Sequence, residues 1–183
     1  MNNLPDEKIV ELVLSGKKDY FCYIVNEYKN QAFSLVVKLV GNIPEKEDIA
    51  QEIFIKIYQK LNTFDCKVSK FSTWFYTIAN NHCIDYMRKK KPVYHPQEIS
   101  ELNIETTKSD HQPEKAYIEK EGRQNINMAL GKLELKYRMP IVYRYVHKLS
   151  YEEIAEIMHL PLGTVKTYIY RAKEKLLGHI SLN

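Results

Sequence analysis

The sequence predicts an all-α protein of two small helical domains, joined by a flexible acidic linker, with a helix-turn-helix in the second domain. Apolar residues recur at helical spacing in most segments, and no strand pattern or internal repeat stands out. Residues 92–115 contain three prolines and little periodicity, as a linker would. We therefore expect domains at residues 1–91 and 116–183.

Composition favours a globular protein outside the membrane. The chain has 183 residues, of which 44% are hydrophobic, enough to build cores. No uninterrupted apolar run approaches the roughly 18 residues of a membrane span, and acidic residues interrupt the N-terminal stretch, unlike a signal peptide. We expect a cytoplasmic location.

The cysteines and histidines predict no metal site and no cofactor. Cys22, Cys66 and Cys83 are far apart and lack metal-ligand spacing, so we expect buried thiols. His82 is next to Cys83, but neighbouring residues on a helix point about 100° apart. The sequence also lacks a zinc-protease motif, a Gly-rich phosphate loop and a nucleophile-base spacing, which argues against an enzyme.

Charge is arranged in three blocks along the chain. The N-terminal domain, the linker and the C-terminal domain carry net charges of +3, −3 and +4. Two basic modules on either side of an acidic connector indicate two sites on a polyanion rather than one diffuse basic surface.

Helix start and stop signals divide the N-terminal domain. The predicted helices run from Pro5 to Ser15-Gly16, from an Asp19 cap to Val40, from about Glu45 to Leu61 and from about Lys70 to Lys91. Gly41-Asn42 ends the second, and Pro92 ends the fourth. In the C-terminal domain, helices are expected near Glu114–Lys132, Tyr137–His147, Tyr151–Met158 and Leu162–Gly178.

The third helix has a distinctive outer face. Isoleucines at 49, 53 and 57 form its core seam with Leu61. The opposite stripe combines two carboxylates, an amide and one apolar residue: Asp48, Gln51, Glu52 and Ile55. A solvated surface is an equal alternative from the pattern alone, although an isoleucine centred in a polar stripe resembles a small interface core.

The fourth helix combines aromatic rings with a C-terminal cluster of cations. Rings beside cations suit single-stranded or opened nucleic acid, since bases stack on rings while cations follow the phosphates. Phe71, Phe75, Ile78 and His82 fall at helical spacing, however, so most rings belong to a core. The polar Asn80 and Asn81 are better candidates for base-edge contacts.

The segment from Ser150 to Leu177 predicts a helix-turn-helix. Ser150 and Glu153 have capping-box spacing, and Pro161 suits the first position of the next helix. That helix buries one apolar stripe and presents hydroxyls, a phenol and cations: Thr164, Lys166, Thr167, Tyr168, Arg171 and Lys173. Such a face can hydrogen-bond base edges and pair with phosphates in a major groove. An ordinary helical hairpin with a solvated basic face is the alternative.

In this order and spacing, the segments resemble a bacterial RNA polymerase sigma factor of the extracytoplasmic-function (ECF) group of the sigma-70 family. DIAQEIF at 48–54 is similar to the polymerase-binding signature, and KFSTWFYTIANN at 70–81 is similar to the promoter-melting segment. LPLGTVKTYIYRAKEKL at 160–176 is similar to the fourth-region helix-turn-helix. The resemblance spans nearly the whole chain and implies a non-enzymatic transcription initiation factor.

The resemblance also implies a role for each candidate residue. The stripe of Asp48, Gln51, Glu52 and Ile55 would meet the clamp helices of the largest polymerase subunit. The minus-ten element and its opening would involve Phe64, Lys67, Ser69, Trp74, Asn80, Asn81, Arg88 and Lys89. The minus-thirty-five element would be bound by Arg144, Thr164, Lys166, Thr167, Tyr168, Arg171 and Lys173.

The implied partners are core RNA polymerase through its beta and beta-prime subunits, promoter DNA and an anti-sigma factor, with no small-molecule substrate. The linker would pass through the polymerase active-site cleft and RNA exit channel.

Two departures from the family pattern affect DNA recognition. Housekeeping sigma factors carry tandem aromatic residues about where Thr77 and Ile78 stand, so we expect less forceful melting and dependence on a near-ideal promoter. Tyr168 occupies a position often filled by arginine, and a phenol cannot make the bidentate contact to guanine. The remaining alternative is a helix-turn-helix regulator whose N-terminal domain senses a ligand or dimerises; unlike a sigma factor, it would require holoenzyme already present.

Overall fold

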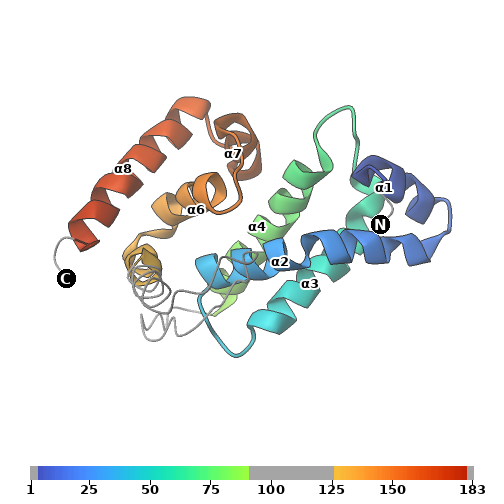
Figure 1. Ribbon diagram of the computed structural model, residues 1–183, viewed down its shortest axis with the longest axis horizontal. Coiled ribbons are helices and arrows are strands. Elements are labelled where there is room, and N and C mark those ends of the chain that lie inside the picture. The colour runs from blue at the N-terminus through green and yellow to red at the C-terminus, as the bar shows by residue number, and fades with distance from the viewer. Residues whose placement is uncertain (1–3, 91–125, 181–183) are drawn as a thin grey trace, which may run out of the picture.

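The computed structural model describes residues 4–90 and 126–180, and this part of the chain is built from helices (Figure 1). The N-terminal half contains α1 (Asp6–Leu14), the 3-10 turn η1 (Lys18–Tyr20), α2 (Phe21–Leu39), α3 (Lys46–Lys60), the 3-10 turn η2 (Leu61–Thr63) and α4 (Phe71–Lys89). The C-terminal half contains a helical stretch at 126–132, then α6 (Leu135–Tyr145), α7 (Tyr151–Met158) and α8 (Leu162–Ile180). The all-α prediction is confirmed, and the predicted linker at 92–115 lies outside the described residues.

Local signals end the first two long helices where expected. Gly16 and Gly41 adopt positive φ angles of 99° and 112°, which a residue without Cβ tolerates. The Asp19 cap is wrong, because Asp19 lies inside η1 and α2 begins at Phe21 without a side-chain cap. The chain enters α2 through a 3-10 turn that continues into helical backbone, which removes the need for a separate cap.

Helix α7, the first helix of the helix-turn-helix, begins with the predicted capping box. The Ser150 amide donates to Glu153 Oε2 at 2.8 Å, and the Glu153 amide donates to Ser150 Oγ at 3.1 Å. His159 then adopts the left-handed conformation, with φ of 52°, and reverses the chain after α7. Pro161 precedes α8 by one residue, and its carbonyl accepts from the amides of Thr164 and Val165.

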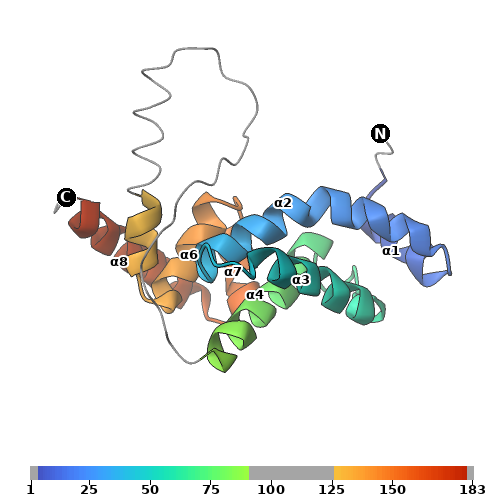
Figure 2. The ribbon, with the colours of Figure 1, turned by 90° about the horizontal axis from the view of Figure 1, so that it is seen from below.

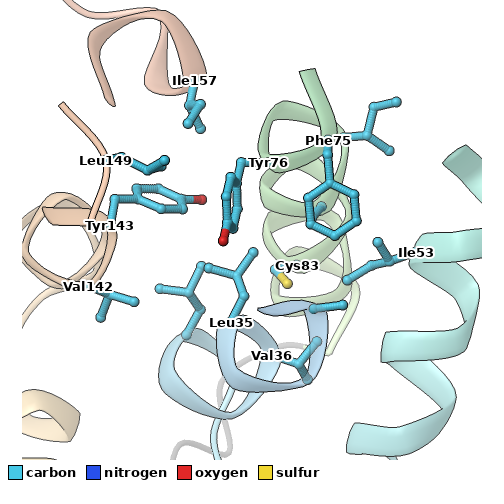
Figure 3. Close-up of a cluster of buried hydrophobic side chains, with 14 of the residues drawn as sticks. Leu35, Val36, Ile53, Phe75, Tyr76, Cys83, Val142, Tyr143, Leu149 and Ile157 are labelled. Carbon is cyan, nitrogen blue, oxygen red and sulfur yellow. The ribbon is translucent and has the colours of Figure 1, made fainter. Parts of the chain in front are cut away.

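Helix α4 is central to the packing. It packs against α2 and α3 on the N-terminal side and against α7 on the C-terminal side, while α6 packs against α2 and α8 (Figures 1 and 2). Buried side chains from both halves therefore belong to one continuous apolar cluster (Figure 3). The two domains are in direct contact across α4, an arrangement that the linker sequence did not predict.

Candidate functional site

The predicted stripe on α3 is open to solvent along its whole length. Asp48, Gln51, Glu52 and Ile55 are all exposed, and Ile55 keeps 56% of its surface accessible. The opposite side of α3 is buried through Ile49, Ile53 and Ile57, as the four-residue repeat predicts. A protruding isoleucine beside two carboxylates forms a surface suited to a partner with an apolar centre and a basic surround.

A buried histidine lies beneath this stripe. His82 Nε2, from α4, is 3.0 Å from Glu52 Oε2, and only 7% of the His82 side chain is exposed. Burial and the nearby Lys56 lower the pKa of His82, whereas Glu52 and Asp85 act in the opposite direction. The sequence analysis assigned His82 only to the core, because its partner is 30 residues away on another helix.

The loop after η2 is organised by aromatic packing. Phe64 contacts the rings of Phe71 and Trp74 with centroid distances of 5.3 and 5.5 Å, which anchors the loop to the start of α4. The Lys67 amide donates to Asp65 Oδ1 at 2.9 Å in a local turn. Lys67 is exposed, Ser69 is half-buried, and Val68, which the sequence analysis passed over, is 79% exposed.

The predicted minus-ten residues of α4 separate into two groups. Asn81, Arg88 and Lys89 are exposed, and Trp74 is half-buried. Asn80, a candidate for base-edge contacts in the sequence analysis, is buried in this structure and only 2% exposed. It lies one helical turn beyond Tyr76 on the side of α4 that the C-terminal domain covers, and its Oδ1 accepts a hydrogen bond from the Tyr143 hydroxyl.

The predicted minus-thirty-five residues gather on α8 and the end of α6. Lys166, Thr167, Arg171 and Lys173 are exposed, whereas Thr164 is half-buried. The placement of Tyr168 on the outer face is wrong: its half-buried ring packs edge-on against Tyr137, at a centroid distance of 5.4 Å. The α8 face therefore keeps its cations but directs this phenol toward α6.

Cations and rings are paired beside this face. Arg144 donates to the Leu149 carbonyl at 2.9 Å, and its guanidinium lies 4.9 Å from the centre of the Tyr151 ring. The Lys173 ammonium lies 5.1 Å from the centre of the Tyr145 ring. These contacts restrict the conformations of two long, flexible cationic side chains.

The sequence analysis missed one residue of the α8 face. Tyr170 is 63% exposed and lies one turn after Thr167, beside Arg171. A helical projection identifies it, because the buried positions Val165, Ile169 and Ala172 fix the opposite side of the helix.

The three cysteines differ in their exposure to solvent. Cys83 is buried, and burial raises the pKa of its thiol to about 12, but the expectation is wrong for Cys22 and Cys66, which are exposed. Cys22 points away from the core-facing side of α2, and Cys66 belongs to the surface loop. Among residues 4–90 and 126–180, no three His, Cys, Asp or Glu side chains are placed to hold a metal ion. No helix in the described chain is long and apolar enough to span a membrane.

Comparison with known sequences agrees with this geometry. Residues 24–93 match the family described as Sigma-70 region 2, and residues 123–176 match Sigma-70, region 4. The ECF RNA polymerase sigma factor SigW of Bacillus subtilis (strain 168) is 42% identical over 176 residues, covering 93% of this chain and 94% of SigW. The ECF RNA polymerase sigma-E factor of Escherichia coli (strain K12) is 36% identical over 181 residues, covering 94% and 93%.

Two solved structures share the fold. One is CnrH in complex with the cytosolic domain of CnrY, with a TM-score of 0.68 and 20% identity, covering 97% of this chain and 98% of that one. The other is the sigma factor RpoE in complex with the anti-sigma factor NepR from Bartonella quintana. Its TM-score is 0.67 at 20% identity, covering 89% and 98%.

The chain therefore belongs to the ECF group of sigma-70 family sigma factors. As a sigma factor, it directs promoter-specific transcription initiation, a role that the family performs without being an enzyme. The alternative of a regulator acting on existing holoenzyme is set aside by the matches to both sigma regions.

Proposed function

We propose that the chain has three binding surfaces. The α3 stripe binds core RNA polymerase, α4 and its preceding loop bind the minus-ten element, and α8 binds the minus-thirty-five element. The single observation that carries this assignment is the exposed stripe of Asp48, Gln51, Glu52 and Ile55 over a fully apolar inner face. A helix of an isolated domain does not need a protruding isoleucine beside carboxylates for stability. A polymerase partner gives that residue a role.

The minus-ten surface suits an opened strand. Phe64 and Trp74 anchor the loop, while the exposed Lys67 and Val68 stand at its edge. In our assignment, the loop residues Phe64, Lys67 and Ser69 hold a flipped base, and Asn81 lies beside the strand. Arg88 and Lys89, at the C-terminal end of α4, hold the upstream phosphates.

The minus-thirty-five surface combines base contacts with phosphate contacts. Thr167 and Arg171 project from the outer ridge of α8 and are our candidates for base edges, joined by Tyr170. The cations Lys166 and Lys173 flank the ridge, and Arg144 is held beside it, so these three are assigned to the backbone.

We assign further properties to the chain. It works in the cytoplasm, where the polymerase is, without small-molecule substrate or cofactor. An anti-sigma factor is its inhibitor, since structural neighbours of the same fold include a sigma factor solved with the anti-sigma factor NepR. The domains are residues 1–91 and 116–183, with 92–115 as the connector through the polymerase cleft.

Reconstituted transcription tests the proposal. Purified chain and bare core polymerase, incubated with a fragment library of the source genome, should give initiation at a defined set of two-part promoters. Core enzyme alone is the control. Initiation that does not depend on the added chain would contradict the assignment.

A further inference from the structure

His82 is a polar residue in a boundary that apolar side chains largely fill. It belongs to α4, which packs against α3, and only 7% of its side chain is exposed. Elsewhere along this boundary, Ile53 of α3 points toward Phe75 of α4 (Figure 3), and the rings of Phe54 and Phe75 lie with centroids 6.0 Å apart. The histidine therefore stands where a hydrophobic residue would be expected.

One nitrogen of the buried imidazole has no hydrogen-bond partner. Among residues 4–90 and 126–180, no group is placed to bond with His82 Nδ1. A buried polar atom without a partner lowers stability, whereas methionine or leucine would fill similar space with no polar nitrogen to desolvate. Packing alone does not account for a histidine at this position.

The other nitrogen faces Glu52, a member of the α3 stripe. His82 Nε2 lies 3.0 Å from Glu52 Oε2, while 59% of the Glu52 side chain remains exposed. Since a carboxylate only accepts hydrogen bonds, the nitrogen that faces it must carry the proton. The buried imidazole thus gives a mobile surface carboxylate a fixed neighbour, and the carboxylate stays open to solvent.

The imidazole has this effect without neutralising the stripe. Burial and the nearby Lys56 lower the pKa of His82 from its usual value of 6.5, whereas Glu52 and Asp85 act in the opposite direction. The imidazole is therefore mainly neutral at pH 7. A neutral neighbour leaves the negative charge of Glu52 available to a basic partner.

We propose that His82 is a positioning residue for core-polymerase binding: from beneath the stripe, it holds the Glu52 carboxylate beside Ile55 in the orientation that the polymerase engages. The proposal rests on the proposed function of the stripe and adds a residue of α4 to it. Restricting a flexible side chain before binding reduces the conformational entropy that association costs. His82 directly follows Asn81, so α4 supports the polymerase surface at one residue and the minus-ten strand at its neighbour.

The affinity of the full chain for bare core polymerase tests this role, with anisotropy of an N-terminal dye as the readout. His82→Met fills similar space without a donor and should weaken binding about three- to tenfold, the cost of ordering one side chain at an interface. His82→Gln keeps an N–H donor at about the position of Nε2 and should bind nearly as tightly as wild type. His82→Leu is a second variant without a donor, for use if the methionine variant does not fold.

Stability should change in the opposite direction from binding. His82→Met removes a buried polar atom without a partner, so its Tm should equal or exceed that of wild type. Cys83→Ala is the matched control, because it truncates the adjacent buried side chain of the same helix. It should lower the Tm and leave the affinity for core polymerase unchanged. This contrast separates positioning from general destabilisation.

A double-mutant cycle attributes the effect to Glu52. Glu52→Ala alone should weaken core binding at least as much as His82→Met. In the Glu52→Ala background, His82→Met should cause no further loss, because the carboxylate that it positions is absent.

The outcomes distinguish this inference from the proposed function. If Glu52→Ala weakens binding but His82→Met does not, His82 is no positioning residue, although the stripe still binds polymerase. The same conclusion follows if His82→Met weakens binding equally with and without Glu52, or if His82→Gln binds no better than His82→Met. If neither Glu52→Ala nor His82→Met changes binding, the assignment of the stripe is wrong and the inference fails with it.

Discussion

Helices α3 and α4 are neighbours in one bundle, yet they present their candidate surfaces in opposite ways. The α3 stripe is exposed along its length, whereas α4 has Asn80 and Tyr76 buried against the C-terminal domain. The difference lies in what each helix packs on: α3 buries only its apolar seam, while α4 is enclosed on two sides. The α3 stripe is therefore accessible in this structure, and part of α4 is covered by the C-terminal domain.

The largest expected effect comes from changing the exposed α3 stripe. Asp48→Lys combined with Glu52→Lys should weaken association with core polymerase by at least about 100-fold, because complementary charges at an interface become repulsive. Pull-down of core enzyme measures the loss, and circular dichroism checks the fold.

Helix α1 offers a matched control for that change. Glu7→Lys with Glu11→Lys has the same four-residue spacing and the same charge change on a different surface. This pair should leave core binding near the wild-type level. Equal loss in both double variants would show that overall charge, rather than the α3 stripe, governs binding.

A large effect on stability is expected where α4 packs against the C-terminal domain. Tyr143→Ala should lower the free energy of unfolding by about 3–5 kcal/mol, since it removes a fully buried ring and strands Asn80. Tyr145→Ala truncates an exposed side chain two residues later and should lower the free energy of unfolding far less. Urea unfolding of both variants measures the difference, and similar midpoints would argue against a packed domain boundary.

The α8 face gives a third, intermediate effect. Arg171→Ala should weaken promoter binding by the holoenzyme by about 1–3 kcal/mol if the guanidinium contacts a base. The loss should depend on the minus-thirty-five sequence. Lys175→Ala, on the side of α8 next to Tyr137, is the control and should have little effect. A uniform loss on every promoter would assign Arg171 to phosphate contact instead.

The smallest effect concerns the cap that starts α7. Ser150→Ala should lower the free energy of unfolding by about 1 kcal/mol, because the Glu153 amide loses its acceptor. Ser150→Gly should cost only a few tenths of that value, as glycine is a tolerated cap. Thermal unfolding compares them, and equal stability of alanine and wild type would show that the capping box is dispensable.

The sequence predicted features that depend on nearby residues. The α3 stripe and the capping box rest on contacts three or four residues apart, and both helices that end at Gly16 and Gly41 carry their own stop signals. The face of α8 was largely predictable for the same reason.

The errors and omissions depend on distant residues. Asn80 looked exposed because its partner Tyr143 is 63 residues away, and Tyr168 looked outward because Tyr137 belongs to another helix. His147 carried no signal at all until the fold placed it beside Tyr76. A pattern within one helix identifies its buried side but not the element that covers the remaining sides.

The most direct test of the account is the affinity of the chain for a fluorescent single-stranded minus-ten oligonucleotide, measured by anisotropy before and after addition of bare core polymerase. The account predicts weak binding by the free wild-type chain and tight, sequence-dependent binding once core enzyme is present. Equal affinity of the free chain and the holoenzyme would contradict the account, in which the C-terminal domain covers part of α4 in the chain alone.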